Sequence, residues 1–549
     1  EMGEDTAAYQ AHDLVRVSII LEDASTLEAY SDAAAEGTLA EDAAAVSYRA
    51  ALQRKQDSVV RKISSTILGR EDLDVVWNLT LVANMISANV EYGKIEQIKQ
   101  IPGVADVVLE QQYEPAASEN TVQPNMEIST GMTGTTTAWS TGYTGAGMRI
   151  AIIDTGLDTS HQSFDNGAYE YALEQNAARA KESVEAYKAS LDLLDADEIN
   201  EKLSLLHIKE GVSAADLYRT EKVAYGYCYI DKDLDVTHET DAEGEHGSHV
   251  AGIAAANRYL PDGNGGYVSA LDSVHMHGAA PDAQVLVMKV FGAGGGAYDT
   301  DYMAAIEDAI VLGCDSINLS LGSGSAGFSR VKNEFTDIMD SLTANGVVVC
   351  MSAGNSSNWA ANSVNNVPYL YDNEISLQTD GSPGSFTNSL TVASVNNSGL
   401  TGSFFTVGEY SVFYNETSYK NAALTTLAGE HDYVILPAGV AGAPADYEGI
   451  DVAGKVVFVQ RGVIPFTEKG DNAVAKGAIA TIVYNNEPGA INMDLTAYKA
   501  TAPCVSISQT DGKAIWAAST QAADGKYATG RMNIRSGVGT GQLNAEFYT

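Results

Sequence analysis

Five apolar runs between residues 149 and 395 constrain the fold of this chain more than any other feature. They are continuous rather than alternating, and helical stretches such as 302–312 and 331–345 separate several of them. Continuous apolar runs fit strands buried on both faces, which are typical of parallel sheets. The runs are RIAIIDTG (149–156), AQVLVMKVF (283–291), CDSINLSLG (314–322), GVVVCMSAGN (346–355) and SLTVASV (389–395). We therefore predict an α/β fold, with a mostly parallel sheet and helices on both faces.

Residues 13–112 form a separate α+β segment ahead of this region. Its predicted elements follow one another as strand, helix, strand, helix and strand. The strands are predicted over 14–21, 78–90 and 105–115, and the helices over 43–68 and 94–100. Residues 113–130 are polar and without period, as expected of a linker that is open to proteolysis.

The character of the sequence changes twice more. Residues 167–222 interrupt the parallel-sheet pattern with a charged helical insertion, which we expect to be a solvated surface excursion. Short strands and turns dominate from residue 401 to residue 535, with one helix at 466–478. This part of the chain therefore predicts a second, β-rich domain.

Charge and cysteine content exclude several classes of protein. Asp and Glu number 72 against 32 Lys and Arg, a formal net charge of −40. Nucleic-acid binding requires a basic footprint, so no nucleic-acid partner is expected. Cys228, Cys314, Cys350 and Cys504 form no CxxC pair, so neither a disulfide framework nor a zinc knuckle is predicted. No apolar run reaches membrane-spanning length, so no membrane segment is expected.

Two polar residues stand where apolar strands end. Asp154 closes the run RIAIID, and Asn355 closes GVVVCMSAGN. Functional groups of open α/β sheets collect at the carboxyl ends of strands. Either residue taken alone is more simply a turn former. An Asn amide at a strand end is also suited to donate to an oxyanion.

The stretch EGEHGSHVAGI holds two histidines, His246 and His249, three residues apart. Metalloprotease helices place their histidines four apart with a Glu between them, so a zinc site is the weaker reading. A metal site would draw on the acidic run Asp241, Glu243 and Glu245, although such a run also fits a helix start. The small residues predict a helix packed tightly on a sheet. We expect His246 at the strand ends and His249 packed within the fold.

The order Asp, His, Asn in this setting resembles the subtilisin-like serine proteases. The resemblance runs over residues 131–400 and is carried by DTGLD, HGSHVAGI, GAAPDAQVLVMKVF, INLSLGS and SAGN. Residues 13–112 resemble the ferredoxin-like inhibitory propeptide of such proteases, with 113–130 as the processing region. Residues 401–535 resemble a protease-associated (PA) domain, through GKVVFVQRG and APCVSISQTDGKAI. The arrangement is similar to that of cell-envelope proteases of Gram-positive bacteria, which insert a PA domain into the catalytic domain.

The resemblance implies a role for each candidate residue. His246 is the expected general base, Asp154 orients and stabilises its imidazole, and Asn355 donates to the oxyanion. Two backbone edges and one pocket wall are expected to bind an extended peptide. They consist of Gly294, Gly295, Gly296, Ser320, Leu321, Gly322, Ser352, Ala353 and Gly354.

The family's nucleophile lies in a GTSMA-like stretch that opens a helix, and none of the 549 residues supplies one. Residues 536–549 are expected to begin the missing half of the catalytic domain. The chain starts with Glu1 rather than Met and shows no signal peptide, so both of its ends are expected to be cut. We therefore expect a fragment that lacks its serine and is inactive as given. The alternative is a serine-less pseudoprotease that acts as a binding or adhesion module.

The resemblance also sets expectations for ligands and location. No cofactor is required for the implied chemistry, and calcium is a possible ligand. The expected partners are a protein or peptide substrate, bound as an extended strand, and the chain's own propeptide as an intramolecular inhibitor. The implied location is extracellular or at the cell surface of a Gram-positive-like bacterium.

Overall fold

The computed structural model describes most of the chain as two compact units. The described residues are 9–35, 38–115, 126–238, 241, 244–292, 296–322, 347–354, 384, 390–393, 399–417, 420–487, 491 and 493–542. The first unit comprises residues 1–118, 138–273 and 277–394, and the second comprises residues 119–137, 274–276 and 395–549.

Four antiparallel strands form the sheet of the N-terminal segment, in the order β2-β3-β1-β4. The elements are β1 (Leu14–Leu21), α1 (Thr26–Ala29), α2 (Ser31–Ala35), α3 (Ala43–Thr66), β2 (Asp74–Leu79), β3 (Met85–Glu91), α4 (Ile95–Ile98) and β4 (Val104–Leu109). The single strand predicted over 78–90 is wrong, because β2 and β3 are separate strands. The amides of Thr80, Leu81 and Val82 donate to the Glu307 carboxylate instead of to a neighbouring strand, so the chain turns there.

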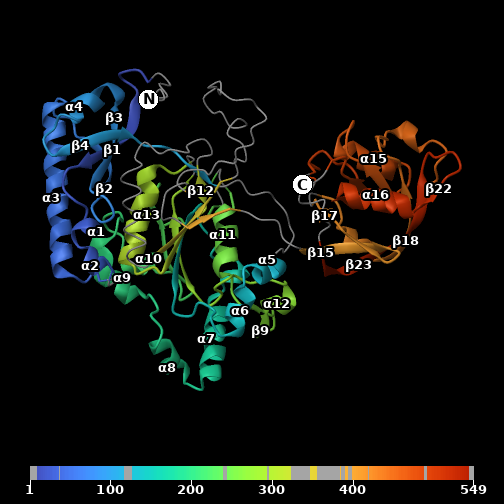
Figure 1. Cartoon of the computed structure of the whole chain (residues 1–549), viewed down its shortest axis with the longest axis horizontal. Coiled ribbons are helices and arrows are strands. Elements are labelled where there is room, and N and C mark those ends of the chain that lie inside the picture. The colour runs from blue at the N-terminus through green and yellow to red at the C-terminus, as the bar shows by residue number, and fades with distance from the viewer. Residues whose placement is uncertain are drawn as a thin grey trace. The chain divides into compact units, whose positions relative to one another are not determined.

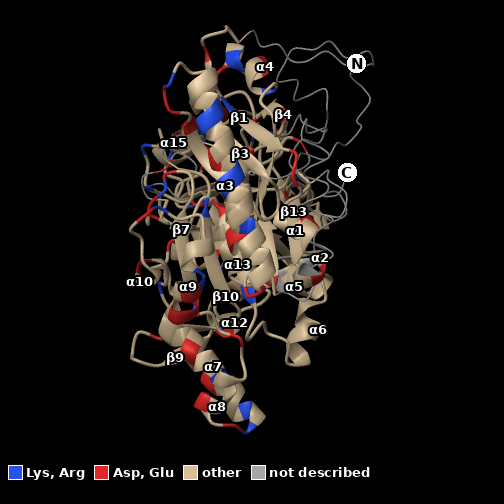
Figure 2. Ribbon diagram, turned by 90° about the vertical axis from the view of Figure 1, so that its left-hand side faces the viewer, with Lys and Arg blue, Asp and Glu red and all other residues tan. Residues whose placement is uncertain are grey.

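Helix α3 covers the outer face of this sheet (Figures 1 and 2). It begins after Asp42, whose side chain accepts a hydrogen bond from the Ala45 amide at 2.7 Å. Its buried residues recur at helical spacing, and they are Ala45, Leu52, Gln56, Val59 and Ile63. Lys and Arg positions are spaced along the helix in Figure 2. The helix is therefore amphipathic, with one stripe on the sheet and a charged face outside.

Six parallel strands form the central sheet, in the order β14-β13-β11-β6-β10-β7. They are β6 (Arg149–Asp154), β7 (Val223–Cys228), β10 (Gln284–Lys289), β11 (Ser316–Leu319), β13 (Val348–Ser352) and β14 (Leu390–Val392). Each of the five apolar runs contains one strand of this sheet, so the predicted parallel sheet is confirmed. Strand β7 has no counterpart in the prediction, because its sequence VAYGYC is short and rich in tyrosine.

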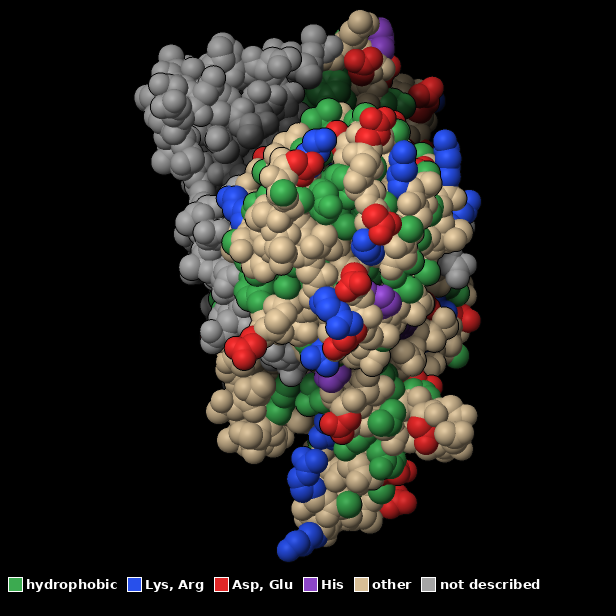
Figure 3. Space-filling model, turned by 90° about the vertical axis from the view of Figure 1, so that its right-hand side faces the viewer, with side chains coloured by type: hydrophobic (Ala, Val, Ile, Leu, Met, Phe, Trp, Pro, Cys, Tyr) green, Lys and Arg blue, Asp and Glu red, His purple; other side chains and the backbone are tan. Residues whose placement is uncertain are grey.

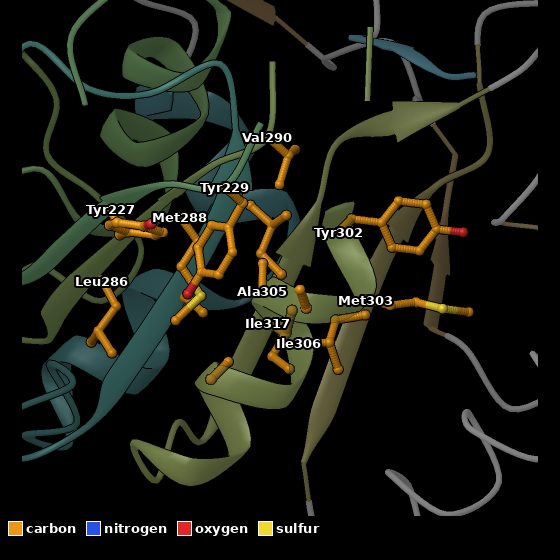
Figure 4. Packing of buried hydrophobic residues seen from close by; sticks show 14 of the residues in the cluster. Tyr227, Tyr229, Leu286, Met288, Val290, Tyr302, Met303, Ala305, Ile306 and Ile317 are labelled. Atoms are coloured by element: carbon orange, nitrogen blue, oxygen red, sulfur yellow. The ribbon is translucent and has the colours of Figure 1, made fainter. Parts of the chain in front are cut away.

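Helices pack on both faces of the central sheet, as predicted. Ile153 and Met288 belong to the buried cluster that includes Ile306 of α13 (Asp299–Val311), and Figure 4 shows part of this cluster. Ile152 belongs to the opposite cluster, which includes Ala251 of α11 (His246–Ala255). Neighbouring residues of one strand thus serve opposite faces of the sheet.

The insertion is partly embedded rather than a solvated excursion, so that prediction is wrong in part. Its helices are α7 (Asn166–Ala180), α8 (Val184–Ala189), α9 (Ala196–Lys202) and α10 (Ala214–Leu217). Ile199 and Leu217 are fully buried in the cluster of the central sheet. Glu198 lies 2.8 Å from the guanidinium of Arg149, which is 2% exposed. Buried apolar residues spaced among the charges hold the insertion on the sheet.

Shorter elements complete the first part of the chain. They are β5 (Glu114–Pro115), α5 (Met126–Met132), α6 (Thr135–Ser140), β8 (Tyr259–Pro261), β9 (Tyr267–Ser269), α12 (Ala270–Ser273) and β12 (Leu321–Gly322). Single-turn 3-10 helices link several of these elements.

The second unit contains one mixed sheet, in the order β16-β15-β23-β18-β19-β20-β21-β17, with β22 beside β23. The elements are β15 (Gly399–Val407), β16 (Tyr410–Phe413), β17 (Asn415–Glu416), β18 (Gly429–Ile435), β19 (Val456–Gln460), α15 (Phe466–Ala475), β20 (Ala480–Tyr484), β21 (Cys504–Ile507), α16 (Gln509–Ala518), β22 (Thr520–Gln521) and β23 (Ala528–Gln542). The prediction contains only one helix here and omits α16. Ser508 caps α16 by accepting from the Asp511 amide at 3.0 Å, and the sequence SxxD was the available signal.

The described surface carries mixed charge. On the face shown in Figure 3, Lys and Arg side chains lie singly or in small groups among acidic and apolar ones. No extended basic field, the footprint of nucleic-acid binding, is visible on that face. Within the described ranges, no helix combines the length and the apolar character needed to cross a bilayer.

One buried lysine makes the stability of the first unit depend on pH. Lys222 is fully buried, and its Nζ donates to the carbonyls of Pro281 and Ala283 at 3.0 and 2.7 Å. Burial lowers the pKa of Lys222 to about 7. The unfolded chain keeps this proton up to about pH 10, so the cost of burying this lysine falls, and the fold gains stability, as pH rises from 7 towards 10. We expect the melting temperature to rise more between pH 7 and pH 9 in the wild type than in Lys222→Met. An equal response of the two proteins would contradict this assignment.

Candidate active site

Asp154 and His246 meet at the carboxyl end of the central sheet. Asp154 is the last residue of β6, and His246 is the first residue of α11. The His246 Nδ1 lies 2.8 Å from Asp154 Oδ1, and the two residues are 7% and 0% exposed. Asp154 Oδ1 also accepts from the Thr155 amide at 2.7 Å. This contact assigns the Nδ1 proton to the carboxylate side and leaves Nε2 as the acceptor of the imidazole.

Glycines allow α11 to approach the end of β6. A Cβ on Gly247 would lie 2.2 Å from the carbonyl oxygen of Gly156. Gly156 has φ +109°, and a Cβ there would lie 2.4 Å from the carbonyl oxygen of Val236. The Gly247 amide donates to Thr155 Oγ1 at 2.8 Å. The close contact therefore depends on residues without side chains, and it brings His246 to Asp154.

Ser248 ties the same turn to the helix. Its Oγ accepts from the Asp158 amide at 2.8 Å and lies 2.8 Å from Nε2 of His238. Ser248, the serine of HGSH, thus holds the loop DTGLD against α11. Its hydroxyl is occupied by these two structural contacts.

The predicted substrate edges lie on either side of an extended segment from the N-terminal part of the chain. Leu321 pairs with Pro115 and Gly322 with Glu114, in antiparallel register. On the other side, the Tyr113 amide donates to the carbonyl of Ala297 at 2.7 Å. These edges therefore hold an extended peptide by backbone pairing, which is β-strand addition.

The pocket residues adjoin one of these edges. Ser352 Oγ donates to the carbonyl of Leu321 at 2.9 Å, and the Ala353 amide donates to the carbonyl of Val392 at 2.9 Å. Gly354 has φ +83°, a conformation that favours glycine. Ser320 lies between β11 and β12. The remaining candidates, Asn355, Gly294 and Gly295, lie outside the described residues.

Comparisons with known proteins identify the family of the chain. The model of the family described as "Subtilase family" matches residues 145–524. The chain belongs to the subtilase family. This subtilase is 29% identical over 448 residues to the PII-type proteinase of Lacticaseibacillus paracasei, a match that covers 79% of this chain and 21% of the relative.

Two further relatives extend the comparison. The minor extracellular protease Vpr of Bacillus subtilis (strain 168) is 29% identical over 411 residues, covering 72% of this subtilase and 38% of the relative. A C5a peptidase of Streptococcus pyogenes is 26% identical over 373 residues, covering 67% and 27%. The chain thus spans well under half the length of each of these relatives.

His249 lies on the surface of the subtilase, so the prediction that it is packed within the fold is wrong. The described residues contain no group of three His, Cys, Asp or Glu side chains that could hold a metal ion. Asp241, which the metal hypothesis invokes, pairs instead with the ammonium of Lys289. Glu243 lies outside the described residues.

Lys289 is a site-proximal residue that sequence reasoning missed. It pairs with Asp154 in the register of β10 and β6, and it is 2% exposed. Its Nζ donates to the carbonyl of Thr237 at 2.5 Å, so it holds the loop that carries Val236 against the Asp154 turn. The only signal in the sequence was a charged residue within the apolar run LVMKVF.

Gly247→Ala tests the close approach of α11. The new Cβ meets backbone atoms at 2.2 to 3.1 Å, so the helix must move and the unfolding free energy falls by roughly 1–3 kcal/mol. Gly252→Ala on the same helix is the matched control, because nothing lies within 4 Å of its Cβ position. That control gains about 0.5–1 kcal/mol from helix propensity. Thermal unfolding compares the two, and a Gly247→Ala variant that melts no lower than Gly252→Ala would refute the packing argument.

Proposed function

We propose that this subtilase supplies the acid–base half of a serine endopeptidase that hydrolyses peptide bonds. The observation that carries the proposal is the 2.8 Å contact between His246 Nδ1 and Asp154 Oδ1 at the carboxyl end of the parallel sheet. An imidazole held in this way presents Nε2 as a base beside the edges that bind an extended peptide. Together these features match the needs of acyl transfer to a serine.

The proposed mechanism assigns each proton to an atom. His246 Nε2 removes the proton of the serine hydroxyl as the serine oxygen attacks the scissile carbonyl. The resulting imidazolium is stabilised by the Asp154 carboxylate, and it then donates the proton to the leaving amine. Asn355 is proposed to donate its side-chain amide to the oxyanion. Water repeats the sequence on the acyl-enzyme and releases the second product.

The nucleophile is the missing part of this mechanism, because the 549 residues contain no GTSMA-like stretch. We define the serine-bearing product as these residues joined to a following segment that carries such a serine. The proposal predicts no peptide turnover by the 549-residue chain alone and turnover by the serine-bearing product. Hydrolysis of a fluorogenic peptide by both proteins tests it. Turnover by the 549-residue chain that His246→Ala abolishes would contradict the proposed absence of the nucleophile.

We propose that residues 13–112 act as an intramolecular inhibitor of this site. The support is that residues 111–115 occupy the predicted substrate edges, and that an ion network joins the N-terminal sheet to α13. Arg16 lies 2.7 Å from Asp301 and 3.1 Å from Glu110, and Trp77 Nε1 donates to Asp301 at 2.8 Å. The βαββαβ connectivity fits a ferredoxin-like propeptide. N-terminal sequencing of the matured serine-bearing product should place the cleavage between residues 112 and 130.

We also propose that residues 401–535 form a PA-like domain inserted within the catalytic domain. The family match spans residues 145–524 and supports an insertion, since it reaches well into this β-rich unit. An extracellular location is proposed from the similarity to a minor extracellular protease. The proposed chemistry needs no cofactor, and calcium as a stabilising ligand is tested by melting the protein with and without a chelator.

A further inference from the structure

The segment of residues 111–115 is bound as a peptide would be, and its contacts therefore describe a binding preference. Gln111 and Asp299 exchange contacts, with the Gln111 amide 2.7 Å from Asp299 Oδ2 and the Asp299 amide 3.2 Å from the carbonyl of Gln111. Gln112 bridges Tyr298 in antiparallel register. With the pairing of residues 114 and 115 to β12, backbone contacts run along the whole segment.

Tyr113 anchors this segment in the body of the protein. Its side chain is 0% exposed and belongs to the buried cluster of the central sheet, together with Leu321 and Ala297. Its ring meets the ring of Tyr302 edge-on, with centroids 5.4 Å apart and an interplanar angle of 82°. Figure 4 shows the Tyr302 ring pointing away from Met288 and Tyr229. An aromatic side chain is thus received by an aromatic wall.

The hydroxyl of Tyr113 also has hydrogen-bond partners in this site. Its side chain hydrogen-bonds with the Asp299 carboxylate and with the side chain of Tyr302. The Tyr302 hydroxyl donates to Asp299 Oδ1 at 3.2 Å. Asp299 is 3% exposed, so its carboxylate depends on these donors rather than on water. A ring without the hydroxyl leaves a buried acceptor short of one partner.

The backbone of Tyr113 lies very close to the backbone of the substrate edge at Gly296. A Cβ on Gly296 would lie 1.9 Å from the carbonyl oxygen of Tyr113. The main chain of the bound segment therefore lies directly on that of the edge.

We propose that Asp299 and Tyr302 form a tyrosine-selecting subsite, which takes the tyrosine of a peptide substrate in the place held by Tyr113. This inference rests on the proposed function and deepens it by naming the substrate class. The ring of the substrate tyrosine fills the aromatic pocket, and its hydroxyl donates a hydrogen bond to the Asp299 carboxylate. Phenylalanine fits the same space and loses the hydrogen bond, so the subsite discriminates on one oxygen atom.

The first experiment uses the 549-residue chain and needs no catalysis. Burial raises the pKa of Asp299 to about 7, so amide hydrogen exchange is measured at pH 8, where the carboxylate is an acceptor. Tyr113→Phe should speed exchange of residues 111–114 by about tenfold or more. Tyr433→Phe is the matched control, because Tyr433 is a buried tyrosine of the second unit whose hydroxyl contacts Ser519 at 2.7 Å. The control should leave this exchange unchanged, and a Tyr113→Phe variant that exchanges like the wild type would overturn the subsite.

The second experiment uses the serine-bearing product and a pair of peptides. The peptides differ only by Tyr or Phe at the position equivalent to Tyr113, and kcat/KM should favour Tyr about tenfold or more. Asp299→Ala removes the acceptor of the tyrosine hydroxyl and should reduce this ratio towards one. Equal cleavage of the two peptides would overturn the subsite. Cleavage of neither would count against the proposed function, and the exchange experiment would still decide the subsite.

Discussion

Asp154→Asn in the serine-bearing product is expected to lower kcat/KM for peptide hydrolysis by roughly 10⁴-fold. Asn keeps an oxygen acceptor for the Thr155 amide and for His246 Nδ1 but carries no negative charge. The His246 imidazolium that forms when Nε2 takes the serine proton therefore loses its stabilising carboxylate. Because Asp154 is 0% exposed and approaches Thr155 and His246 through Oδ1 alone, an isosteric Asn fits without repacking.

The control for this prediction is Asp262→Asn. Asp262 is an exposed acid whose side chain accepts from the Asn264 amide at 2.7 Å, remote from the candidate site. Its replacement should leave the peptidase rate near that of the wild type. Retention of more than a tenth of the wild-type rate by Asp154→Asn would show that the charge of this carboxylate does not support His246 as the base.

Glu307→Ala is expected to have the largest effect on stability. The Glu307 carboxylate is fully buried and accepts from the amides of residues 80–82 at 2.7 to 3.2 Å. It also pairs with Arg49 at 3.2 Å and contacts His207 at 3.2 Å. Removing the carboxylate leaves the Arg49 guanidinium and three backbone amides without their acceptor. We therefore expect the free energy of unfolding to fall by roughly 3–5 kcal/mol.

Hydrogen exchange of residues 80–82 measures this loss as a drop in the free energy of local opening. Glu307→Gln is the informative control, because it keeps an oxygen acceptor for the amides and removes the charge that pairs with Arg49. It should fall between the wild type and Glu307→Ala. Unchanged exchange in Glu307→Ala would show that the N-terminal segment is held by its other contacts.

The parallel sheet could be predicted because its strands are buried on both faces and so appear as continuous apolar runs. The approach of Asp154 and His246 could also be predicted, since strand ends of such a sheet meet at one edge. The turn between β2 and β3 could not, because its cause is Glu307, more than 220 residues away in the chain. Contacts between distant segments leave no periodicity in either one.

The same reason explains the other errors. The insertion looked solvated because charged residues are interspersed among the apolar residues, such as Ile199, that anchor it. His249 was assigned to the interior because the spacing of two histidines does not say which side of a helix is covered. The place of Tyr113 between two substrate edges is likewise a tertiary fact that the polar sequence around it does not reveal.

The central claim is that Asp154 and His246 activate a serine that lies outside the 549 residues. A fluorophosphonate that labels activated serines, followed by mass spectrometry of the serine-bearing product, tests this claim most directly. We predict one labelled serine, located beyond residue 549, and loss of the label in His246→Ala. A label on any serine within residues 1–549, or labelling that persists in His246→Ala, would contradict the account.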